Sequence, residues 1–499
     1  MQKKIIEKIL ELKKKGKRIG LAHGVFDILH VGHVKYLNEA KKNIDILVVS
    51  VTADKYVNKG PHKPIFNINK RMKVLKSLND VDYVIESNHG TAKNVIQAIK
   101  PNYYIKGKDY LKNKDVTKNL QVEIKLVKKY GGKVIFTNTE LHSSSKIINE
   151  KYSLVNPKAQ KIIKSIDPKK IKNKFLDTFE NKINKKILVI GEPIQDIFKY
   201  VKPSGKSNKS NIISTLYQNK NEIAGGSILV ANTLSEFCKN VSLTCFEKNN
   251  KNFYMKNLNK NIKKIFIKSN FDIIKKTRYI DEYSGNKFFQ VTENEEENFD
   301  KNHIKEYLKI LKKEIKKVDY VFIFDFGYNA VKNEVLNLIN QIPSKKKIIN
   351  CQTNSFNFGY NNFHKYNGSE LMIIDEIEFR LGCQSKSEKI KNLIESKLIN
   401  SKKFNSLTVT LGKYGCITKE KNSTRSVFIP SLFDITKNSI GCGDIFASIF
   451  GLLSLSKRFT VLEKSLLSHL AAGLYGLRKD HNQRVNFVNL YKTINSFIT

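Results

Sequence analysis

The sequence predicts an α/β protein with two domains, and three observations lead to that prediction. The chain has 499 residues, which is too long for one ordinary hydrophobic core. In both halves, apolar stretches of strand length alternate with stretches of helical periodicity, as in parallel sheets covered by helices. Two glycine-bearing turns, at residues 24–33 and 441–444, each lead into a predicted helix. Such turns present backbone amides at the positive end of a helix, where phosphate binds.

The composition is that of a globular protein, with 40% hydrophobic and 10% aromatic residues. No stretch approaches the ~18 apolar residues of a membrane span. The first seven residues, Met1–Glu7, lack the apolar segment of a signal peptide. The six cysteines include no C-x-x-C pair, which argues against a disulfide framework or a zinc site. We therefore expect a cytoplasmic protein.

The formal net charge of +43 raises the alternative of a nucleic-acid-binding protein. Residues 1–150 hold 30 Lys and Arg against 14 Asp and Glu, and the remaining residues hold 59 against 32. The excess is therefore spread along the chain, and basic and aromatic residues do not alternate as they do in single-strand-binding proteins. We favour a general lysine and asparagine bias, and keep nucleic-acid binding as the alternative from another functional class.

The first 150 residues predict a parallel sheet. Residues 2–15 have helical periodicity, residues 18–22 form a short strand, and a helix follows the turn that ends at His33. Further strands are predicted over residues 44–51, 83–85, 103–106 and 133–136, and helices near 67–79, 91–99 and 117–130. Ligands of such sheets bind at the C-terminal ends of the strands.

His30 and His33 stand at such a strand end, in the sequence His30-Val31-Gly32-His33. Two imidazoles three residues apart share one side of a first helical turn, and Gly32 leaves room for a ligand. Together they can hold phosphate oxygens and stabilise charge on a reacting phosphorus. A metal-binding pair and a purely structural pair are the alternatives.

These residues resemble the signature of the cytidylyltransferase-like nucleotidyltransferases, Gly24-Val25-Phe26-Asp27-x-x-His30-x-Gly32-His33. The resemblance covers about residues 16–150 and implies a Rossmann-like domain that transfers NMP from ATP or CTP to a phosphate monoester. It implies that His30 and His33 stabilise the transition state and that Lys59 shares in catalysis. The remaining nucleotide-binding residues that it implies are Gly24, Phe26, Arg71, Lys106, Asp109, Ser143, Ser144 and Ser145.

Residues 151–185 keep rough helical spacing and predict a helical linker that packs on one domain. We accordingly expect one domain over residues 1–150 and a second over residues 186–499.

The second domain repeats the pattern of apolar strands with polar ends. The residues at these predicted ends are Glu192, Asp325, Gln352, Asp375 and Thr410. If the strands are parallel, the five ends converge on one edge and line a single site. Residues 276–282 and 287–292 predict a hairpin that forms a small lid.

The turn Gly441-Cys442-Gly443-Asp444 runs into the apolar stretch 445–453, which predicts a buried helix. The glycines allow a tight turn whose amides bind an anion, and Asp444 can accept a proton from an attacking hydroxyl. A simple glycine turn with a capping aspartate is the alternative.

Residues 186–480 resemble the ribokinase (PfkB-type) sugar kinases, with Gly441-Cys442-Gly443-Asp444 in place of their Gly-Ala-Gly-Asp. The resemblance implies that Asp444 is the base, and that Gly441, Cys442 and Gly443 hold the transferring phosphoryl group. It implies a nucleotide turn at Thr410, Gly412 and Gly415, and Mg²⁺ organised by Asp375 and Glu378. The sugar contacts that it implies are Asp196, Gly225, Gly226, Asn232, Arg278 and Asp444. Glu192 and Asn438 replace two aspartates of the family pattern, which weakens the kinase prediction relative to nucleotidyl transfer.

The two halves together resemble the bifunctional heptose-phosphate kinase and heptose 1-phosphate adenylyltransferase enzymes, with the domain order reversed. This resemblance implies phosphorylation of a sugar phosphate at its anomeric hydroxyl, followed by NMP transfer to the sugar 1-phosphate. The expected ligands are Mg²⁺, ATP, CTP as an alternative nucleotidyl donor, and a sugar phosphate, without a membrane partner. A homodimer and a separate phosphatase between the two steps stay open. So does a nucleotidyltransferase with an inactive kinase-like domain.

Overall fold

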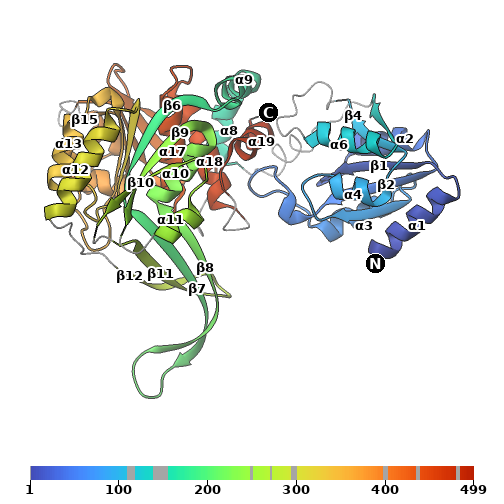
Figure 1. The fold of residues 1–499 in the computed structure, drawn as a ribbon, viewed down its shortest axis with the longest axis horizontal. Helices are drawn as coiled ribbons and strands as arrows, with labels where there is room; N and C mark the ends of the chain where they lie inside the picture. The colour runs from blue at the N-terminus through green and yellow to red at the C-terminus, as the bar shows by residue number, and fades with distance from the viewer. Residues whose placement is uncertain are drawn as a thin grey trace. The chain divides into compact units, whose positions relative to one another are not determined.

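The computed structural model describes residues 2–108, 119–138, 155–247, 251–269, 272–293, 301–396, 403–433, 439–478 and 484–498. The chain forms two compact units (Figure 1). Unit 1 consists of Met1–Val155 together with Val488–Thr499, and unit 2 consists of Asn156–Phe487.

Unit 1 is built on a parallel sheet with the strand order β3-β2-β1-β4-β5. Its strands are β1 (Ile19–Gly24), β2 (Ile46–Thr52), β3 (Tyr83–Ser87), β4 (Tyr103–Gly107) and β5 (Lys133–Thr137). The order reverses between β1 and β4, so a crevice is expected beyond their C-terminal ends. The strands and their parallel arrangement confirm the sequence prediction.

Helices cover both faces of this sheet, because alternate residues of each strand point to opposite sides. The helices are α1 (Gln2–Lys14), α2 (Val31–Lys41), α3 (Ile68–Lys76), α4 (Lys93–Ile99) and α6 (Asn119–Lys129), with the 3₁₀ turn η1 (Asp54–Tyr56). Ala22 of β1 packs in one core cluster with Leu37 of α2 and Leu75 of α3. Leu21 of β1 belongs to the opposite cluster, which includes residues of α1, α4 and α6.

Unit 2 contains a large sheet, with nine strands among the described residues, in the order β10-β9-β6-β13-β14-β15-β16-β17-β18. The strands are β6 (Ile183–Gly191), β9 (Cys238–Glu247), β10 (Lys263–Lys268), β13 (Tyr320–Asp325), β14 (Lys347–Cys351), β15 (Gly368–Asp375), β16 (Lys403–Thr410), β17 (Cys416–Glu420) and β18 (Val427–Ile429). All neighbours from β10 to β16 pair in parallel, and the last two pairs are antiparallel.

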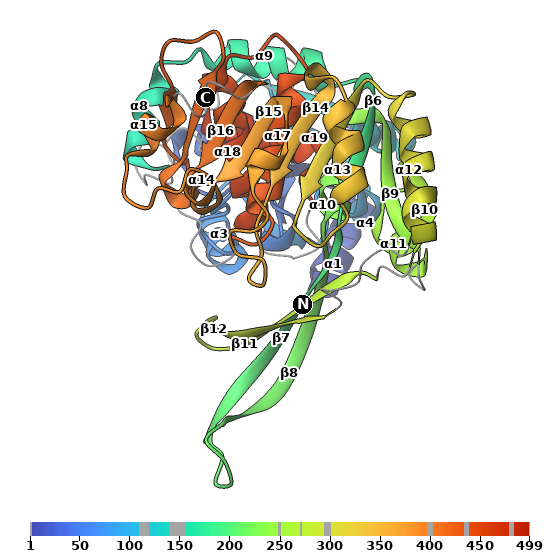
Figure 2. The same ribbon diagram turned by 90° about the vertical axis from the view of Figure 1, so that its left-hand side faces the viewer.

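Helices flank the large sheet on both sides, with α12 and α13 on the side away from α10 and α17 (Figures 1 and 2). The helices are α8 (Pro157–Lys164), α9 (Pro168–Phe179), α10 (Ser227–Phe237), α11 (Lys251–Asn257), α12 (Lys301–Ile315), α13 (Asn333–Gln341), α14 (Glu376–Gly382), α15 (Ile390–Ile394), α17 (Cys442–Ser454) and α18 (Val461–Gly476). Three 3₁₀ turns are η2 (Ser344–Lys346), η3 (Phe363–Lys365) and η4 (Gly412–Tyr414). All of residues 445–453 in α17 are buried, which confirms the predicted buried helix after Asp444.

A second, smaller sheet projects from unit 2 (Figure 2). It consists of β7 (Pro193–Lys206), β8 (Ile213–Gly226), β11 (Ile274–Asp281) and β12 (Lys287–Glu293) in the order β12-β11-β7-β8. β11 and β12 are the predicted lid hairpin. The long antiparallel ribbon of β7 and β8 was not predicted, because its outer residues are polar or isolated and show no regular alternation.

The predicted linker contains helices α8 and α9, which are part of unit 2. The ring of Phe175 stacks on Phe487 and packs against Phe179 and Phe237. The final helix is α19 (Phe487–Phe497). It was expected in the second domain, but from Val488 onward it is part of unit 1. Its buried side chains pack against the loop at residues 58–63, which the periodicity of either segment alone does not reveal.

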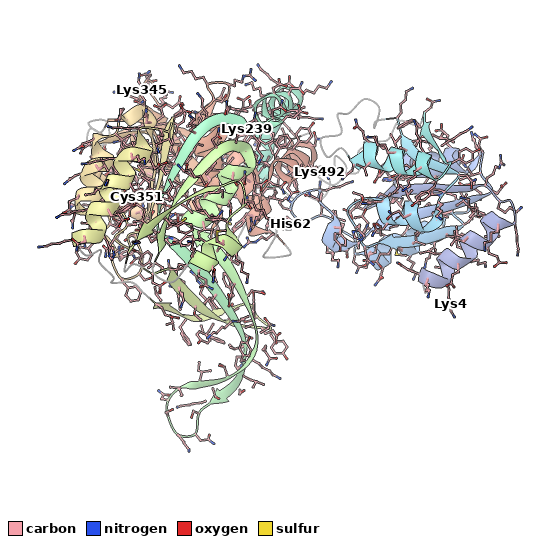
Figure 3. All side chains as sticks on the ribbon, viewed as in Figure 1. Lys4, His62, Lys239, Lys345, Cys351 and Lys492 are labelled. Atoms are coloured by element: carbon pink, nitrogen blue, oxygen red, sulfur yellow. The ribbon has the colours of Figure 1, made fainter. Side chains whose placement is uncertain are left out.

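The surface of each unit carries many lysines, and those labelled in Figure 3 come from widely separated parts of the sequence. Among the described residues, no helix combines the length and the hydropathy that crossing a bilayer requires.

Candidate active sites

Five neighbouring strands of the large sheet end in polar residues at the same edge. β6, β13, β14, β15 and β16 all pair in parallel. The residues at or just after their C-terminal ends are Glu192, Asp325, Gln352, Asp375 and Thr410. These ends could converge only if the strands were parallel, and the observed pairing confirms that the strands are parallel.

Asp444 is the third residue of α17, which begins after Gly441 in a left-handed conformation with φ of 79°. Oδ1 of Asp444 accepts a hydrogen bond from the side-chain amide of Gln352 at 2.8 Å. Burial raises the pKa of Asp444 to about 6, an effect that the nearby Asp196 strengthens and Gln352 opposes. This carboxyl group is still ionised at neutral pH, and it accepts a proton more readily than an exposed aspartate does.

A cavity of about 190 Å³ lies beside Asp444. The predicted site residues that line it are Asp196, Gly225, Gly226, Arg278, Gly441 and Asp444. Asp196 of β7 forms an ion pair with the guanidinium of Arg278 on β11. The small sheet and the start of α17 therefore meet at one enclosed polar site.

The two glycines at the end of β8 make room for this site. A Cβ atom on Gly225 would lie 2.4 Å from Oδ2 of Asp196, and one on Gly226 would lie 2.5 Å from the carbonyl oxygen of Glu192. Gly226 also has a positive φ of 57°, which side chains disfavour. Gly225 therefore leaves the space that the Asp196 carboxylate occupies, and Gly226 allows the chain to pass close to the Glu192 carbonyl.

We expect Gly225→Ala to raise the KM of the sugar acceptor at least tenfold, because the new methyl group displaces the Asp196 carboxylate. Phosphorylation kinetics at varied acceptor concentration measure this effect. Gly90→Ala is the matched control, since the nearest neighbour of a Cβ there lies 3.9 Å away. An unchanged acceptor KM in Gly225→Ala would contradict the assignment of this cavity.

Two cationic side chains of the cavity were missed at the sequence level, Lys276 and Arg478. Lys276 lies on the same strand as Arg278, two residues earlier, so the alternation of β11 could have indicated it. Arg478 follows α18, and its guanidinium carbon lies 3.6 Å from the centre of the Tyr475 ring. Nε of Arg478 is buried without a hydrogen-bond partner, which leaves a cationic donor for an anionic ligand. Arg478 is one of only eight arginines in a lysine-rich chain. This scarcity was the available signal in the sequence that could have pointed to Arg478.

Asn232 does not line the cavity, contrary to the sequence prediction. Its side-chain amide donates to the carbonyl of Asn257 at 2.9 Å and accepts from the amide of Asn259 at 2.9 Å. The side chain is thus occupied in holding the loop after α11.

Asp375 and Glu378, the predicted metal residues, form a capping box at the start of α14. The two oxygens of Glu378 accept from the amides of Thr353 at 2.8 Å and Asp375 at 3.2 Å. Burial raises the pKa of Glu378 to about 8 and raises that of Asp375. Among the described residues, no group of three or more acidic, histidine or cysteine side chains could hold a metal ion.

This pair nevertheless fits an indirect role toward Mg²⁺. Carboxylate oxygens suit this hard cation, which retains several of its waters in most proteins. Each oxygen of Glu378 keeps a lone pair beside its backbone hydrogen bond, and a nearby cation would restore a lower pKa.

The predicted nucleotide turn lies next to this pair, because Thr410 is the parallel register partner of Asp375. Gly412 begins η4 and Gly415 follows it, with φ of 55° and 121°. A Cβ on Gly412 would meet no atom within 4 Å, whereas one on Gly415 would lie 2.1 Å from the carbonyl oxygen of Ile429. The turn thus has an open backbone at Gly412, and Gly415 allows close chain approach.

Of the amides at the start of α17 that were predicted to bind an anion, that of Cys442 is already engaged within the protein. The amide of Cys442 donates to the carbonyl of Ser439 at 3.0 Å. The next amides, of Gly443 and Asp444, stand in the first turn and have no acceptor within the helix. Gly443 is exposed, and a Cβ there would meet no atom within 4 Å.

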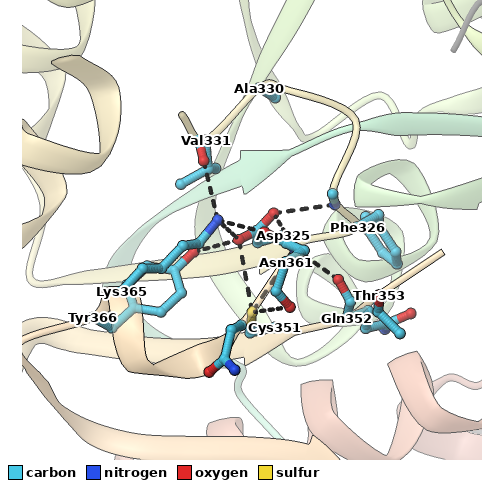
Figure 4. A network of polar contacts seen from close by, with 12 residues as sticks. Asp325, Phe326, Ala330, Val331, Cys351, Gln352, Thr353, Asn361, Lys365 and Tyr366 are labelled. Atoms are coloured by element: carbon cyan, nitrogen blue, oxygen red, sulfur yellow. Dashed lines mark hydrogen bonds and ion pairs between the residues drawn. The ribbon is translucent and has the colours of Figure 1, made fainter. Parts of the chain in front are cut away.

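Glu192 and Asp325 do not line the cavity. Figure 4 shows the polar contacts around Asp325. The Glu192 carboxylate is buried and accepts from the amides of Phe326, Tyr328 and Ala330 at 2.9–3.1 Å. Asp325 accepts from the hydroxyl of Tyr366 at 2.7 Å and pairs with Lys365. Burial and the charge of Asp325 raise the pKa of Glu192. The family pattern has an aspartate where this chain has Glu192. The carboxylate of Glu192 holds the loop that carries Phe326, and Phe326 lines the cavity.

In unit 1, His30 and His33 lie together at the start of α2, with ring centres 4.1 Å apart. Nδ1 of His30 accepts from the amide of Gly32 at 3.1 Å, so the proton of its neutral ring is on Nε2. Burial lowers the pKa of His33 to about 3, and the charges of His30 and Lys59 contribute. Both rings are half-buried, and Nδ1 of His33 is buried without a partner.

The loop beneath these histidines is held by its own residues. Phe26 has a positive φ of 50°, and its ring lies 5.5 Å from that of His33. A Cβ on Gly24 would lie 3.0 Å from the Phe26 ring. Gly24 and Phe26 thus shape the strand end beside the histidine pair.

The predicted phosphate-binding cations of unit 1 lie in different environments. Lys59 lies close enough to His33 to affect its pKa. The guanidinium of Arg71 is fully buried and donates to the carbonyls of Val25, Phe66 and Thr52 and to the Asp54 carboxylate. Arg71 therefore holds loops of the site together, with four of its five N–H groups engaged in these contacts.

Lys106 is buried with its ammonium 3.6 Å from the Glu123 carboxylate, and its charge contributes to lowering the pKa of His23. It is thus an interior residue near the site rather than a free cation at its rim. The predicted residues Asp109, Ser143, Ser144 and Ser145 lie outside the described residues.

Comparison with known families gives one match for each unit. Residues 21–150 match the cytidylyltransferase-like family, and residues 184–466 match the pfkB family carbohydrate kinases.

Individual relatives match a smaller part of the chain. The protein named bifunctional protein HldE of Aliarcobacter butzleri is 44% identical over 137 residues, which are 27% of this chain and 29% of that protein. HldE of Pseudomonas fluorescens is 36% identical over 145 residues, which are 29% of each chain. The chain thus spans less than a third of the length of these relatives.

Two solved structures are similar in fold at low identity. Phosphofructokinase-2 from Escherichia coli has a TM-score of 0.49 at 12% identity, over 62% of this chain and 98% of that chain. Ribokinase from Thermotoga maritima has a TM-score of 0.46 at 14% identity, over 62% and 99%. Neither likeness carries an argument about function.

Proposed function

The chain belongs to the pfkB family of carbohydrate kinases, and from this premise we propose a bifunctional enzyme that makes a nucleotide-activated sugar. Unit 2 phosphorylates a sugar phosphate at its anomeric hydroxyl with ATP. Unit 1 transfers NMP from ATP or CTP to the sugar 1-phosphate and releases pyrophosphate. A heptose 7-phosphate is the leading acceptor, on the resemblance described above.

The observation that carries the kinase proposal is the position of Asp444 on the wall of a polar cavity. Asp444 accepts the proton of the sugar hydroxyl while the hydroxyl oxygen attacks the γ-phosphorus, and the bond to the ADP oxygen breaks. The ion pair of Asp196 and Arg278 orients the sugar. The first-turn amides of Gly443 and Asp444 stabilise the charge on the transferring group.

The cations of the cavity favour an acceptor that already carries a phosphate. Arg278 is neutralised by Asp196, but Lys276 and Arg478 add positive charge to the same cavity. The unpartnered Nε of Arg478 gains a charge-assisted hydrogen bond when a phosphate enters. Mg²⁺, held near Asp375 and Glu378, would neutralise the phosphates of ATP.

In unit 1, the neutral rings of His30 and His33 donate hydrogen bonds to the oxygens of the α-phosphate as charge develops on them. Lys59 neutralises the adjacent phosphates. A phosphate oxygen of the sugar 1-phosphate attacks the α-phosphorus and pyrophosphate leaves, so the anomeric phosphate that unit 2 adds is the group to which unit 1 transfers NMP.

The proposal includes a homodimer, a cytoplasmic location and a separate phosphatase that removes the second phosphate between the two steps. The projecting small sheet of unit 2 offers exposed apolar side chains to a second copy, among them Ile213, Leu216 and Phe289. None of the six cysteines, all of them described, forms a disulfide, which suits a reducing compartment.

The test is ADP formation by the full chain over a panel of sugars and sugar phosphates, compared with Arg478→Gln. We expect the KM of the phosphorylated acceptor to rise 10–100-fold in the variant, as loss of a charge-assisted hydrogen bond predicts. The KM of an unphosphorylated sugar should hardly change. Arg458→Gln, at an exposed position, is the control. Absence of ADP with every acceptor would favour a nucleotidyltransferase with an inactive kinase-like domain.

A further inference from the structure

The final helix, α19, packs in unit 1 against the loop that carries Lys59. This helix lies outside residues 21–150, the part of the chain that matches the nucleotidyltransferase family. His62 of the loop and Lys492 of the helix are both labelled in Figure 3.

Three contacts join the helix to the loop, on both sides of Lys59. The side-chain amide of Asn58 donates to the side-chain oxygen of Asn489. The ammonium of Lys63 donates to the hydroxyl of Ser496 and lies 4.6 Å from the centre of the Phe497 ring. These contacts engage the residue just before Lys59 and the residue four positions after it.

The third contact is the close approach of Gly60 to the helix. Gly60 has φ of 96°, and a Cβ there would lie 2.7 Å from the Phe497 ring and 3.2 Å from the Thr493 methyl group. The peptide next to Lys59 therefore rests directly on the helix, and only glycine fits.

The far side of the loop is anchored on the histidine strand end. The buried carboxylate of Asp27 accepts from the amides of Ile65 at 2.8 Å and Phe66 at 3.0 Å. The loop is thus fixed by α19 on one side and by Asp27 on the other, with Lys59 between them. Lys59 is also near enough to Asp27 and Lys492 to feel both charges.

We propose that α19 positions the Lys59 loop for nucleotidyl transfer, with Ser496 and Phe497 as positioning residues. This inference rests on the proposed function of unit 1. An unsupported loop would have to become ordered when the nucleotide binds, and this ordering costs conformational entropy. Packing against the helix orders the loop in the folded chain already, so this entropy is not lost when the substrate binds.

The experiment compares the full chain with Phe497→Ala, Ser496→Ala and Gly60→Ala. We expect kcat/KM for nucleotidyl transfer to fall at least tenfold in Phe497→Ala and Gly60→Ala, and less in Ser496→Ala, with partial recovery in Ser496→Thr. The phosphorylation rate of unit 2 in the same preparations should stay unchanged. Val488→Ala, at a partly exposed position at the other end of the helix, is the matched control.

Hydrogen exchange separates this inference from the proposed function. Amides of residues 57–63 should exchange faster in Phe497→Ala than in the unmodified chain, whether or not nucleotidyl transfer is observed. Unchanged exchange there would overturn the inference, and so would full transfer activity in all three variants. If Phe497→Ala lowers both activities and the melting temperature, Ser496→Ala decides, since it removes one hydroxyl. Loss of transfer in that variant supports positioning, and no loss opposes it.

Discussion

Asp444→Asn is expected to lower the phosphorylation rate by about 10²–10⁴-fold while leaving nucleotidyl transfer unchanged. Asparagine can keep a hydrogen bond to Gln352 but cannot accept the proton of the sugar hydroxyl. Separate assays of ADP formation and pyrophosphate release on the same preparation measure the two effects.

The pH dependence of the unmodified kinase is an independent control for this role. Since the pKa of Asp444 is raised to about 6, kcat/KM should fall tenfold per pH unit below pH 6, as the base becomes protonated. The pKa of Asp444 is higher in the folded chain than in an ordinary aspartate. Ionisation of Asp444 therefore lowers the free energy of unfolding as pH rises toward 6. The melting temperature of Asp444→Asn at pH 8 should therefore not be lower than that of the unmodified chain. Full kinase activity in this variant would remove Asp444 from the mechanism.

The second large effect is expected for His33→Ala, which should lower nucleotidyl transfer by about 10²–10³-fold and leave phosphorylation intact. The alanine cannot donate to the oxygens of the reacting phosphate. Pyrophosphate release measures the change. His89→Ala, at an exposed position in unit 1, is the matched control.

His33→Ala also tests the separation of the two sites. With its pKa lowered to about 3, the His33 ring of the free protein is neutral at pH 7. The role proposed for His33, donation of a hydrogen bond, therefore needs no positive charge on its ring. If either single variant lost both activities while remaining folded, the two-site proposal would be wrong.

Sequence reasoning reached most of the fold because hydrophobic periodicity is local. Each strand of unit 1 and the buried helix after Asp444 were predicted from their own residues. The convergence of Glu192, Gln352 and Asp375 followed from parallel pairing alone. The β7–β8 ribbon was missed because its exposed outer half has no apolar face to impose a pattern.

The predicted site residues likewise divide into those that the structure brings together and those that it does not. Asp444, Asp196 and Gly225 were predicted from glycine turns and family resemblance, and the structure brings them together. Arg71, Asn232 and Lys106 were predicted on the same basis, yet their side chains are engaged with the protein interior. Residue type and spacing do not state which way a side chain turns.

The sequence by itself therefore predicted the α/β fold of both units, which the structure confirms, and two glycine-bearing turns whose phosphate binding stays a prediction, because each of these patterns depends on neighbouring residues. Only the tertiary structure shows that Arg478 lines the cavity beside Asp444 and that Ser496 and Phe497 contact the loop of Lys59. Such contacts join residues up to several hundred positions apart, and no local pattern encodes which distant side chain fills a given space.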